Sequence, residues 1–354
     1  TTPRTPPNWW TAPETIRSGN PTERLITMTN DESTRYADQA GNVGPATLDG
    51  LRDDTAEQAR RFANAPRLEL FGTVRMLRDR IFSFLDGGQP IRERRDLYFL
   101  AAAACGMLAA VSDDLGYSAA AMSQARVAHV FAAEADDPAL TGWLYAQQAT
   151  ICYWNGQPGK ARDYARRGAA LHPAGTVGVW LPAIEGGVSG ELGDAEAARS
   201  AVRRAAEVRE TVQPGTLDQF GGLLGLNPAK QHMWAASAFL GIGDDTAVVT
   251  EAQAAVEAYQ SGLELERAYD NMTIAWFQAA TSQARAGDLD ASVHLAQAAF
   301  AIAPEHRDAR VDKTAKRLHQ QLRNAEIRTS PLAIDTRDGI EDFLSAAPTR
   351  LELP

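Results

Sequence analysis

Residues 286–304, AGDLDASVHLAQAAFAIAP, have the composition of a turn, a short alanine-rich helix and a closing proline. Gly287 suits the left-handed conformation that ends a preceding helix, and Asp288 beside it can cap the following one. Pro304 stops the second helix, because proline has no backbone N–H to donate. The stretch therefore predicts the second half of a helical hairpin, and it decides the fold if the same turn recurs.

Related turns occur four more times upstream. They are DLGYSAAA around Gly116, NGQPGKA around Gly156, ELGDAEAA around Gly193 and GIGDDTA around Gly243, and successive glycines through Gly287 are 40, 37, 50 and 44 residues apart. Self-similarity at such a spacing is typical of solenoids built from one repeated unit. We therefore expect a series of hairpins.

Small residues stand at fixed positions relative to each turn. Those seven residues before the glycines are Ala109, Ala149, Gly186, Ala236 and Ala280, and those twelve after are Ala128, Gly168, Ala205, Ala255 and Ala299. Small residues at matching positions let two antiparallel helices approach closely. The pattern resembles the tetratricopeptide repeat, whose closing proline corresponds to Pro173 and Pro304.

The body of the chain is expected to be all-α, because apolar residues recur at helical spacing from about residue 47 without sustained alternation. With the resemblance, this predicts a tetratricopeptide-like right-handed solenoid of antiparallel helical hairpins. Its expected divisions are a linker at 1–45, an N-terminal hairpin at 46–90, repeats at 91–304, capping helices at 305–348 and a tail at 349–354. The apolar stripe in 68–85 either packs against the first full hairpin or forms a dimer surface.

Charge and hydropathy exclude several classes of protein. A net charge of −10 argues against nucleic-acid binding by this chain itself, because phosphate binding needs a cationic face. Without an apolar run near the roughly 20 residues that span a bilayer, we expect a cytoplasmic protein with no membrane partner.

Cys105 and Cys152 lie in apolar stretches and are expected to be buried thiols. Thr1 and the proline-rich start predict a chain cut from a longer one.

Several segments resemble a more specific family. They are RRDLYFLAAAACGMLAAVSDDLG (94–116), GWLYAQQATICYWNGQPGKARDYARRG (142–168), GTVGVWLPAIEGGVSGELGDAEAA (175–198), LDQFGGLLGLNPAKQHMWAASAFL (217–240) and IEDFLSAAP (340–348). They are similar to the C-terminal halves of actinobacterial helix-turn-helix (XRE-type) transcriptional regulators, and the resemblance covers roughly 65–348. In that family a DNA-binding domain precedes a helical array that senses a ligand or mediates self-association. The resemblance implies a sensing domain, homodimer formation, and DNA contact only through a segment absent from this chain.

The tetratricopeptide register places candidate ligand contacts on the concave side of each first helix. The positions thirteen, ten, six and three residues before the turn glycines give Trp143, Tyr153, Trp180, Lys230, Met233, Ile274 and Phe277. The aromatic residues offer stacking surface and Lys230 a charge partner for a peptide or small-molecule effector. The alternative is that the large apolar residues pack between neighbouring helices as core.

The segment 214–230, PGTLDQFGGLLGLNPAK, is the longest interruption between hairpins. It either folds into the groove or forms a surface connector, and the connector is the simpler expectation. The acidic pairs Asp113–Asp114, Asp136–Asp137 and Asp244–Asp245 are expected to cap helices.

No catalytic constellation or zinc-like spacing stands out, with His232 near the groove the one histidine of interest. We therefore expect no enzyme, metal or cofactor. The alternative to a ligand sensor is a constitutive protein-interaction scaffold that shows no response to a ligand.

Overall fold

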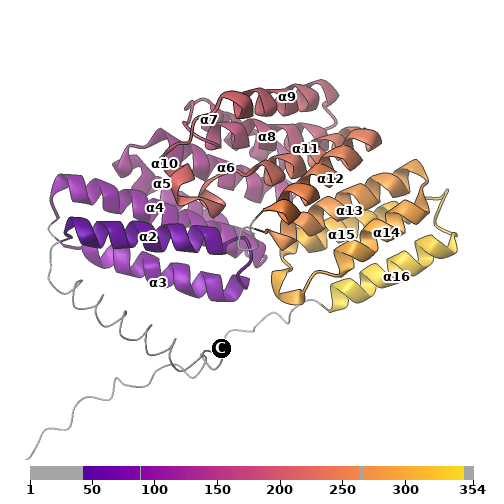
Figure 1. Cartoon of the computed structure of the whole chain (residues 1–354), viewed down its shortest axis with the longest axis horizontal. Helices are drawn as coiled ribbons and strands as arrows, with labels where there is room; N and C mark the ends of the chain where they lie inside the picture. Colours follow the sequence, from indigo (N-terminus) through magenta and orange to yellow (C-terminus); the bar gives the residue numbers. More distant parts are fainter. Residues whose placement is uncertain (1–42, 88, 263–266, 347–354) are drawn as a thin grey trace, which may run out of the picture.

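The computed structural model describes residues 43–87, 89–262 and 267–346 (Figure 1). Most of the expected linker at 1–45 and the whole tail at 349–354 lie outside these residues. The α-helices are α2 (Pro45–Arg61), α3 (Arg67–Leu85), α4 (Ile91–Asp114), α5 (Ser118–Ala135), α6 (Pro138–Trp154), α7 (Pro158–Ala169), α8 (Val177–Glu191), α9 (Ala195–Thr211), α10 (Thr216–Phe220), α11 (Pro228–Ile242), α12 (Asp245–Ser261), α13 (Tyr269–Ala286), α14 (Leu289–Phe300), α15 (Ala309–Gln321) and α16 (Pro331–Ser345). Two short 3-10 helices are η1 (Gly222–Leu224) and η3 (Pro304–His306), and the described part of the chain has no strand. The expected all-α class is confirmed.

The helices pair as the turns predict. Each expected turn joins two helices that pack along their lengths, giving the hairpins α4–α5, α6–α7, α8–α9, α11–α12 and α13–α14 (Figure 1). Successive first helices also pack on one another, as α8 does on both α6 and α11. The fold is therefore the expected solenoid of antiparallel helical hairpins.

The turn chemistry explains where these helices stop and start. Gly287 ends α13 with φ at 87°, and the Asp288 side chain accepts a hydrogen bond from Ala291 N at 3.0 Å. Asp194 and Asp244 cap α9 and α12 in the same way. A left-handed glycine followed by an aspartate cap thus reverses the chain at each of these places.

The ten small register residues are all buried, in agreement with close helix packing. At Gly186 in α8, a Cβ atom would lie 3.2 Å from the Val202 side chain of α9. The contact between hairpins is closer still, because a Cβ on Gly190 would overlap the backbone of Ala238 in α11. Small residues therefore set the spacing both within a hairpin and between hairpins.

The N-terminal and C-terminal helices cover the two ends of the array. In α3, the stripe residues Leu70, Val74 and Ile81 are fully buried, and α3 packs on α4. The stripe is therefore core, and the dimer surface expected there as an alternative is wrong. At the other end α15 packs on α13, and α16 packs on α14 and α15.

Helix α4 is long and apolar enough to cross a membrane by length and composition, contrary to the expectation that no apolar stretch is long enough. In the structure 83% of its apolar window is buried against other helices. This is the environment of a central core helix, and its composition is accounted for by packing.

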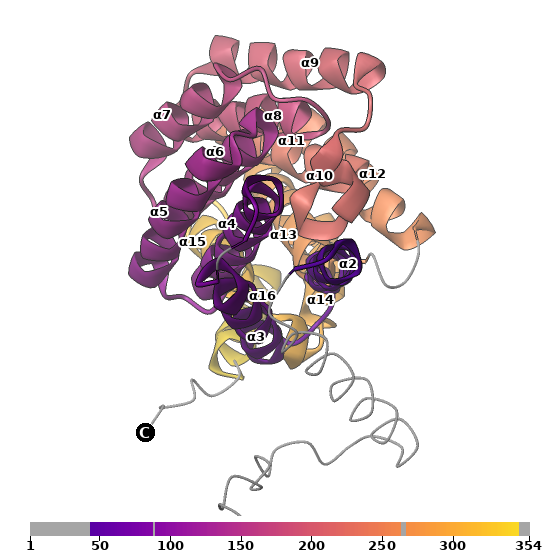
Figure 2. The same ribbon diagram turned by 90° about the vertical axis from the view of Figure 1, so that its left-hand side faces the viewer.

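The array curls so that helices from its two ends meet. Helix α15 contacts α4 as well as α13, and Figure 2 shows them side by side. Lys313 of α15 donates to the Asn155 side chain at 3.1 Å, and Arg317 of α15 lies 3.1 Å from Glu191 at the end of α8. The concave interior is therefore closed in by the C-terminal helices.

Candidate functional site

The connection between α9 and α11 folds into the interior of the array. Leu224 and Leu226 are buried, and the Trp143 indole donates a hydrogen bond to the Leu223 carbonyl at 3.0 Å. Gly222, with φ at 53°, sits so close to α2 that a Cβ would overlap the Ala59 carbonyl oxygen. The expectation of a plain surface connector is wrong, because the leucines of this segment are buried between α2 and α6.

Asp218 holds this connection in place. Its carboxylate accepts hydrogen bonds from Gly215 N at 2.7 Å, from Thr176 N at 3.0 Å and from the Thr176 hydroxyl. The same hydroxyl oxygen accepts from Leu226 N at 2.8 Å. The two ends of the connection are therefore tied to the start of α8.

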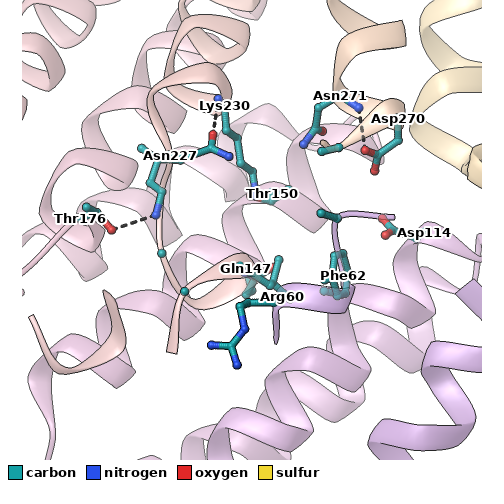
Figure 3. A pocket seen from close by; sticks show the side chains of 18 of the residues that line it. Arg60, Phe62, Asp114, Gln147, Thr150, Thr176, Asn227, Lys230, Asp270 and Asn271 are labelled. Atoms are coloured by element: carbon teal, nitrogen blue, oxygen red, sulfur yellow. Dashed lines mark hydrogen bonds between the residues drawn. The ribbon is translucent and has the colours of Figure 1, made fainter. Parts of the chain in front are cut away.

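The connection closes one side of a cavity of about 330 Å³ in the middle of the array (Figure 3). Polar side chains of its wall include Gln147, Thr150, Asn227 and Lys230, and apolar ones include Phe62, Ile151, Leu223 and Leu226. A cavity of this size, whose wall combines apolar side chains with polar and charged ones, can hold a small molecule.

Two hydrogen-bond donors on this wall have no acceptor within the described residues. Gln147 is only 3% exposed, and its Nε2 has no hydrogen-bond partner. The Lys230 ammonium lies 3.9 Å from the centroid of the Trp180 ring, and neither a hydrogen bond nor an ion pair joins it to a described residue. Burial lowers the pKa of Lys230 to about 7, with repulsion from Arg310 adding to the effect. Gln147 Nε2 is a buried donor without a partner, which is costly, and the half-buried Lys230 ammonium has no counter-ion among the described residues, so both groups favour a ligand that supplies acceptors.

Beside these donors lies a buried ion-pair cluster, defined here as Arg67, Asp114, Asp270, Asp308 and Arg310. Arg67 of α3 lies 2.9 Å from Asp114 of α4 and 2.7 Å from Asp270 of α13. Arg310 of α15 lies 3.2 Å from Asp114 and 2.5 Å from both Asp270 and Asp308. The cluster joins the N-terminal helices to the C-terminal ones, and three of its members, Asp114, Asp270 and Arg310, line the cavity.

The cluster holds three carboxylates against two guanidinium groups. Burial raises the pKa of Asp114 to about 7, although Arg310 and Arg67 oppose the shift. Burial also acts on Asp270, but there Arg310 and Arg67 prevail and lower the pKa. A proton on Asp114 therefore relieves the excess negative charge. The carboxylate oxygens of Asp114, Asp270 and Asp308 lie within 4.8 Å of one another, a spacing that would allow them to share a metal ion. In this structure the Arg310 guanidinium group contacts all three carboxylates instead.

Most of the predicted groove residues lie in the core between helices. Trp143, Trp180, Met233, Ile274 and Phe277 are fully buried, and Tyr153 is 9% exposed. For these apolar residues the structure fits the core alternative, with the Phe277 ring 5.7 Å from that of Phe343 in α16. Of the predicted set, Lys230 lines the cavity. Trp143 and Trp180 contact residues of the cavity wall: Trp143 donates to the Leu223 carbonyl, and the Trp180 ring packs against the Lys230 ammonium. A role of these residues in ligand binding stays a prediction.

The roles of Asp113, Asp114 and Gln147 differ from those predicted from the sequence. Asp137 and Asp244 cap helices as expected, but Asp114 joins the ion-pair cluster and Asp113 accepts from the Asn155 side chain at 2.8 Å. The sequence feature that could have identified Gln147 as a site residue is its polar side chain within the apolar helix α6. His232 lies 2.7 Å from Glu251 and does not line the main cavity.

Comparisons with known proteins find likeness among solved structures. No protein-family model matches the chain, and no curated protein matches it. Among solved structures, the chain is similar to the TPR domain of P58(IPK), with 12% identity and a TM-score of 0.26, over 85% of this chain and 84% of that one. The assignment of the fold rests on the helix pairing described above.

Proposed function

We propose that this chain is the ligand-sensing domain of a transcriptional regulator and that it binds a small molecule in the central cavity. The observation that carries the proposal is Gln147, a residue of the cavity wall whose buried Nε2 has no hydrogen-bond partner among the described residues. Proteins rarely leave a buried donor unpaired, so a ligand acceptor is the natural partner. The volume of about 330 Å³ favours a small metabolite over a peptide, which narrows the choice that the sequence left open.

The position of the cavity suggests how binding is transmitted. Its wall includes Asp114, Asp270 and Arg310, which also join helices from the two ends of the array. A ligand that contacts this wall better in one curvature of the array than in another shifts the population toward that curvature. In a regulator, such a shift changes the geometry presented to an attached DNA-binding domain or to a second subunit.

The test is a thermal-shift screen of a metabolite library, followed by native mass spectrometry of the hits. We expect saturable binding to the parent protein and loss of binding in Gln147→Leu, because leucine cannot donate to the ligand. The matched control is Gln297→Leu, at an exposed glutamine on α14, which should bind as the parent does. Equal binding by both variants would place the ligand elsewhere and contradict the proposal.

A constitutive scaffold for another protein is the second candidate. It is favoured by Val127 and Val130, which stand 42% and 64% exposed on the same helix α5. Exposed apolar side chains close together are common at protein-binding surfaces. If Val130→Lys abolishes capture of a protein partner whose binding Gln147→Leu leaves unchanged, the scaffold is the better description.

A further inference from the structure

We infer that the ligand of the central cavity is a small carboxylic acid whose carboxylate is held by Lys230 Nζ and Gln147 Nε2. The inference rests on the proposed function, since it names the chemistry of the molecule bound there. Figure 3 shows Lys230 entering the cavity from α11 and Gln147 entering it from α6. The two residues come from different hairpins and line one cavity.

The carboxylates of the cavity wall and several of its other acceptors already have partners, whereas these two donors have none among the described residues. Asp114 and Asp270 are paired with the arginines of the ion-pair cluster. Asn227 Oδ1 accepts from the backbone N–H of Lys230 at 2.8 Å, and Tyr259 Oη accepts from Asn271 at 3.1 Å. The unpaired groups named on this wall, Lys230 Nζ and Gln147 Nε2, are therefore N–H donors, and they call for an acceptor group on the ligand.

The charge on Lys230 points to an anion. Taking this ammonium out of water is costly, and Arg310 repels it, so a negative group beside it stabilises the charged form. A carboxylate offers two oxygens, one for each of the two donors. A phosphate carries more oxygens and more charge than these two donors satisfy. Of the two arginines on the wall, Arg310 is committed to three carboxylates, and Arg60 donates to the Phe220 carbonyl at 3.2 Å.

The apolar side chains of the wall indicate the nature of the rest of the molecule. Phe62, Ile151, Leu223 and Leu226 give the same cavity an apolar part of its wall. An apolar body attached to the carboxylate would bury its surface there. The predicted ligand class is thus a monocarboxylic acid with an aliphatic or aromatic body.

The test uses matched pairs of acids and primary amides: hexanoate with hexanamide, octanoate with octanamide and benzoate with benzamide, plus inorganic phosphate. Isothermal titration calorimetry of the full chain should show at least one acid binding ten-fold or more tightly than its amide. In Lys230→Met, which keeps the aliphatic stem over Trp180, the acid and the amide should bind equally. Circular dichroism and thermal unfolding check that the variant is folded.

Proton uptake gives an independent readout. Because the pKa of Lys230 is lowered to about 7, most of this lysine is neutral at pH 8 in the empty cavity. A bound carboxylate should restore its charge, so titrations at pH 8 in buffers of different ionisation enthalpy should reveal proton uptake by the parent protein. Lys230→Met should show less uptake, whereas uptake that is unchanged in this variant would overturn the assignment of Lys230.

The outcomes separate this inference from the proposed function. Equal binding of acids and amides by the parent protein, or phosphate binding tighter than that of every acid, overturns the carboxylate while leaving a cavity ligand in place. Binding by no acid also overturns the carboxylate inference. The proposed function itself fails only if the wider metabolite screen gives no ligand that Gln147→Leu weakens.

Discussion

The repeated hairpin turns and the single connection between α9 and α11 both depend on glycine, but the connection needs it for an additional reason. At Gly287 a Cβ would meet nothing within 4 Å, so the residue serves only the left-handed backbone. At Gly222 a Cβ would overlap the backbone of α2, so the residue serves close packing as well. The turns at the edge of the array therefore recur and leave room for a larger side chain, whereas the central connection occurs once and leaves no such room.

The largest effect should come from breaking the central ion-pair cluster. Asp270→Ala leaves Arg67 and Arg310 without one of their carboxylates in a buried site, and we expect a loss of about 3–5 kcal/mol in the free energy of unfolding. The exposed pair Arg75–Asp79 is the control, and Asp79→Ala should change stability by less than about 1 kcal/mol. Urea denaturation measures both, and similar losses would show that the cluster contributes no more than a surface pair.

Glycine substitutions compare the two regions directly. Gly222→Ala should cost about 3 kcal/mol or more, because the methyl group forces the connection away from Ala59 and φ is positive. Gly287→Ala keeps open space around the methyl group and should cost about 1 kcal/mol, for the left-handed backbone alone. Equal costs in urea denaturation would mean that the connection is as loosely held as a turn.

The pH dependence should also distinguish the centre. With its pKa raised to about 7, Asp114 is protonated more readily in the folded chain than in the unfolded one. Its contribution to stability is therefore fully present below the unfolded pKa and is lost as the pH rises through about 7. Asp114→Asn removes this loss, so the stability of the variant relative to the parent should rise by about 2 kcal/mol between pH 5 and pH 8. A constant difference across these pH values would contradict the assignment.

The smallest effect is expected at a turn cap. Asp288→Ala removes the acceptor for Ala291 N and should lower the free energy of unfolding by about 1 kcal/mol. Asp288→Ser keeps a capping oxygen and should recover most of that loss. Thermal or urea unfolding of the pair measures the cap, and a serine variant as unstable as the alanine variant would show that capping is not the cause.

The edge of the array could be predicted from the sequence, but most of its centre could not. Turn glycines, aspartate caps and small register residues act over a few neighbouring positions, so their spacing predicts the hairpins. The ion-pair cluster joins Arg67 to Asp270 and Arg310, more than two hundred residues along the chain, and no local pattern links them. Lys230 was found because it falls on the repeat register, whereas Gln147 falls outside the chosen positions.

The meeting of α15 with α4 has a consequence for how the protein unfolds. In an open solenoid each unit contacts only its neighbours, so stability is nearly a sum of local terms and an end unit can fray by itself. Here contacts between Arg67 and Asp270 and between Asp114 and Arg310 connect the first helices to the last ones, as in a ring rather than a line. Loss of either end therefore removes contacts from the other, which favours a single cooperative transition and slow folding through contacts of long sequence separation.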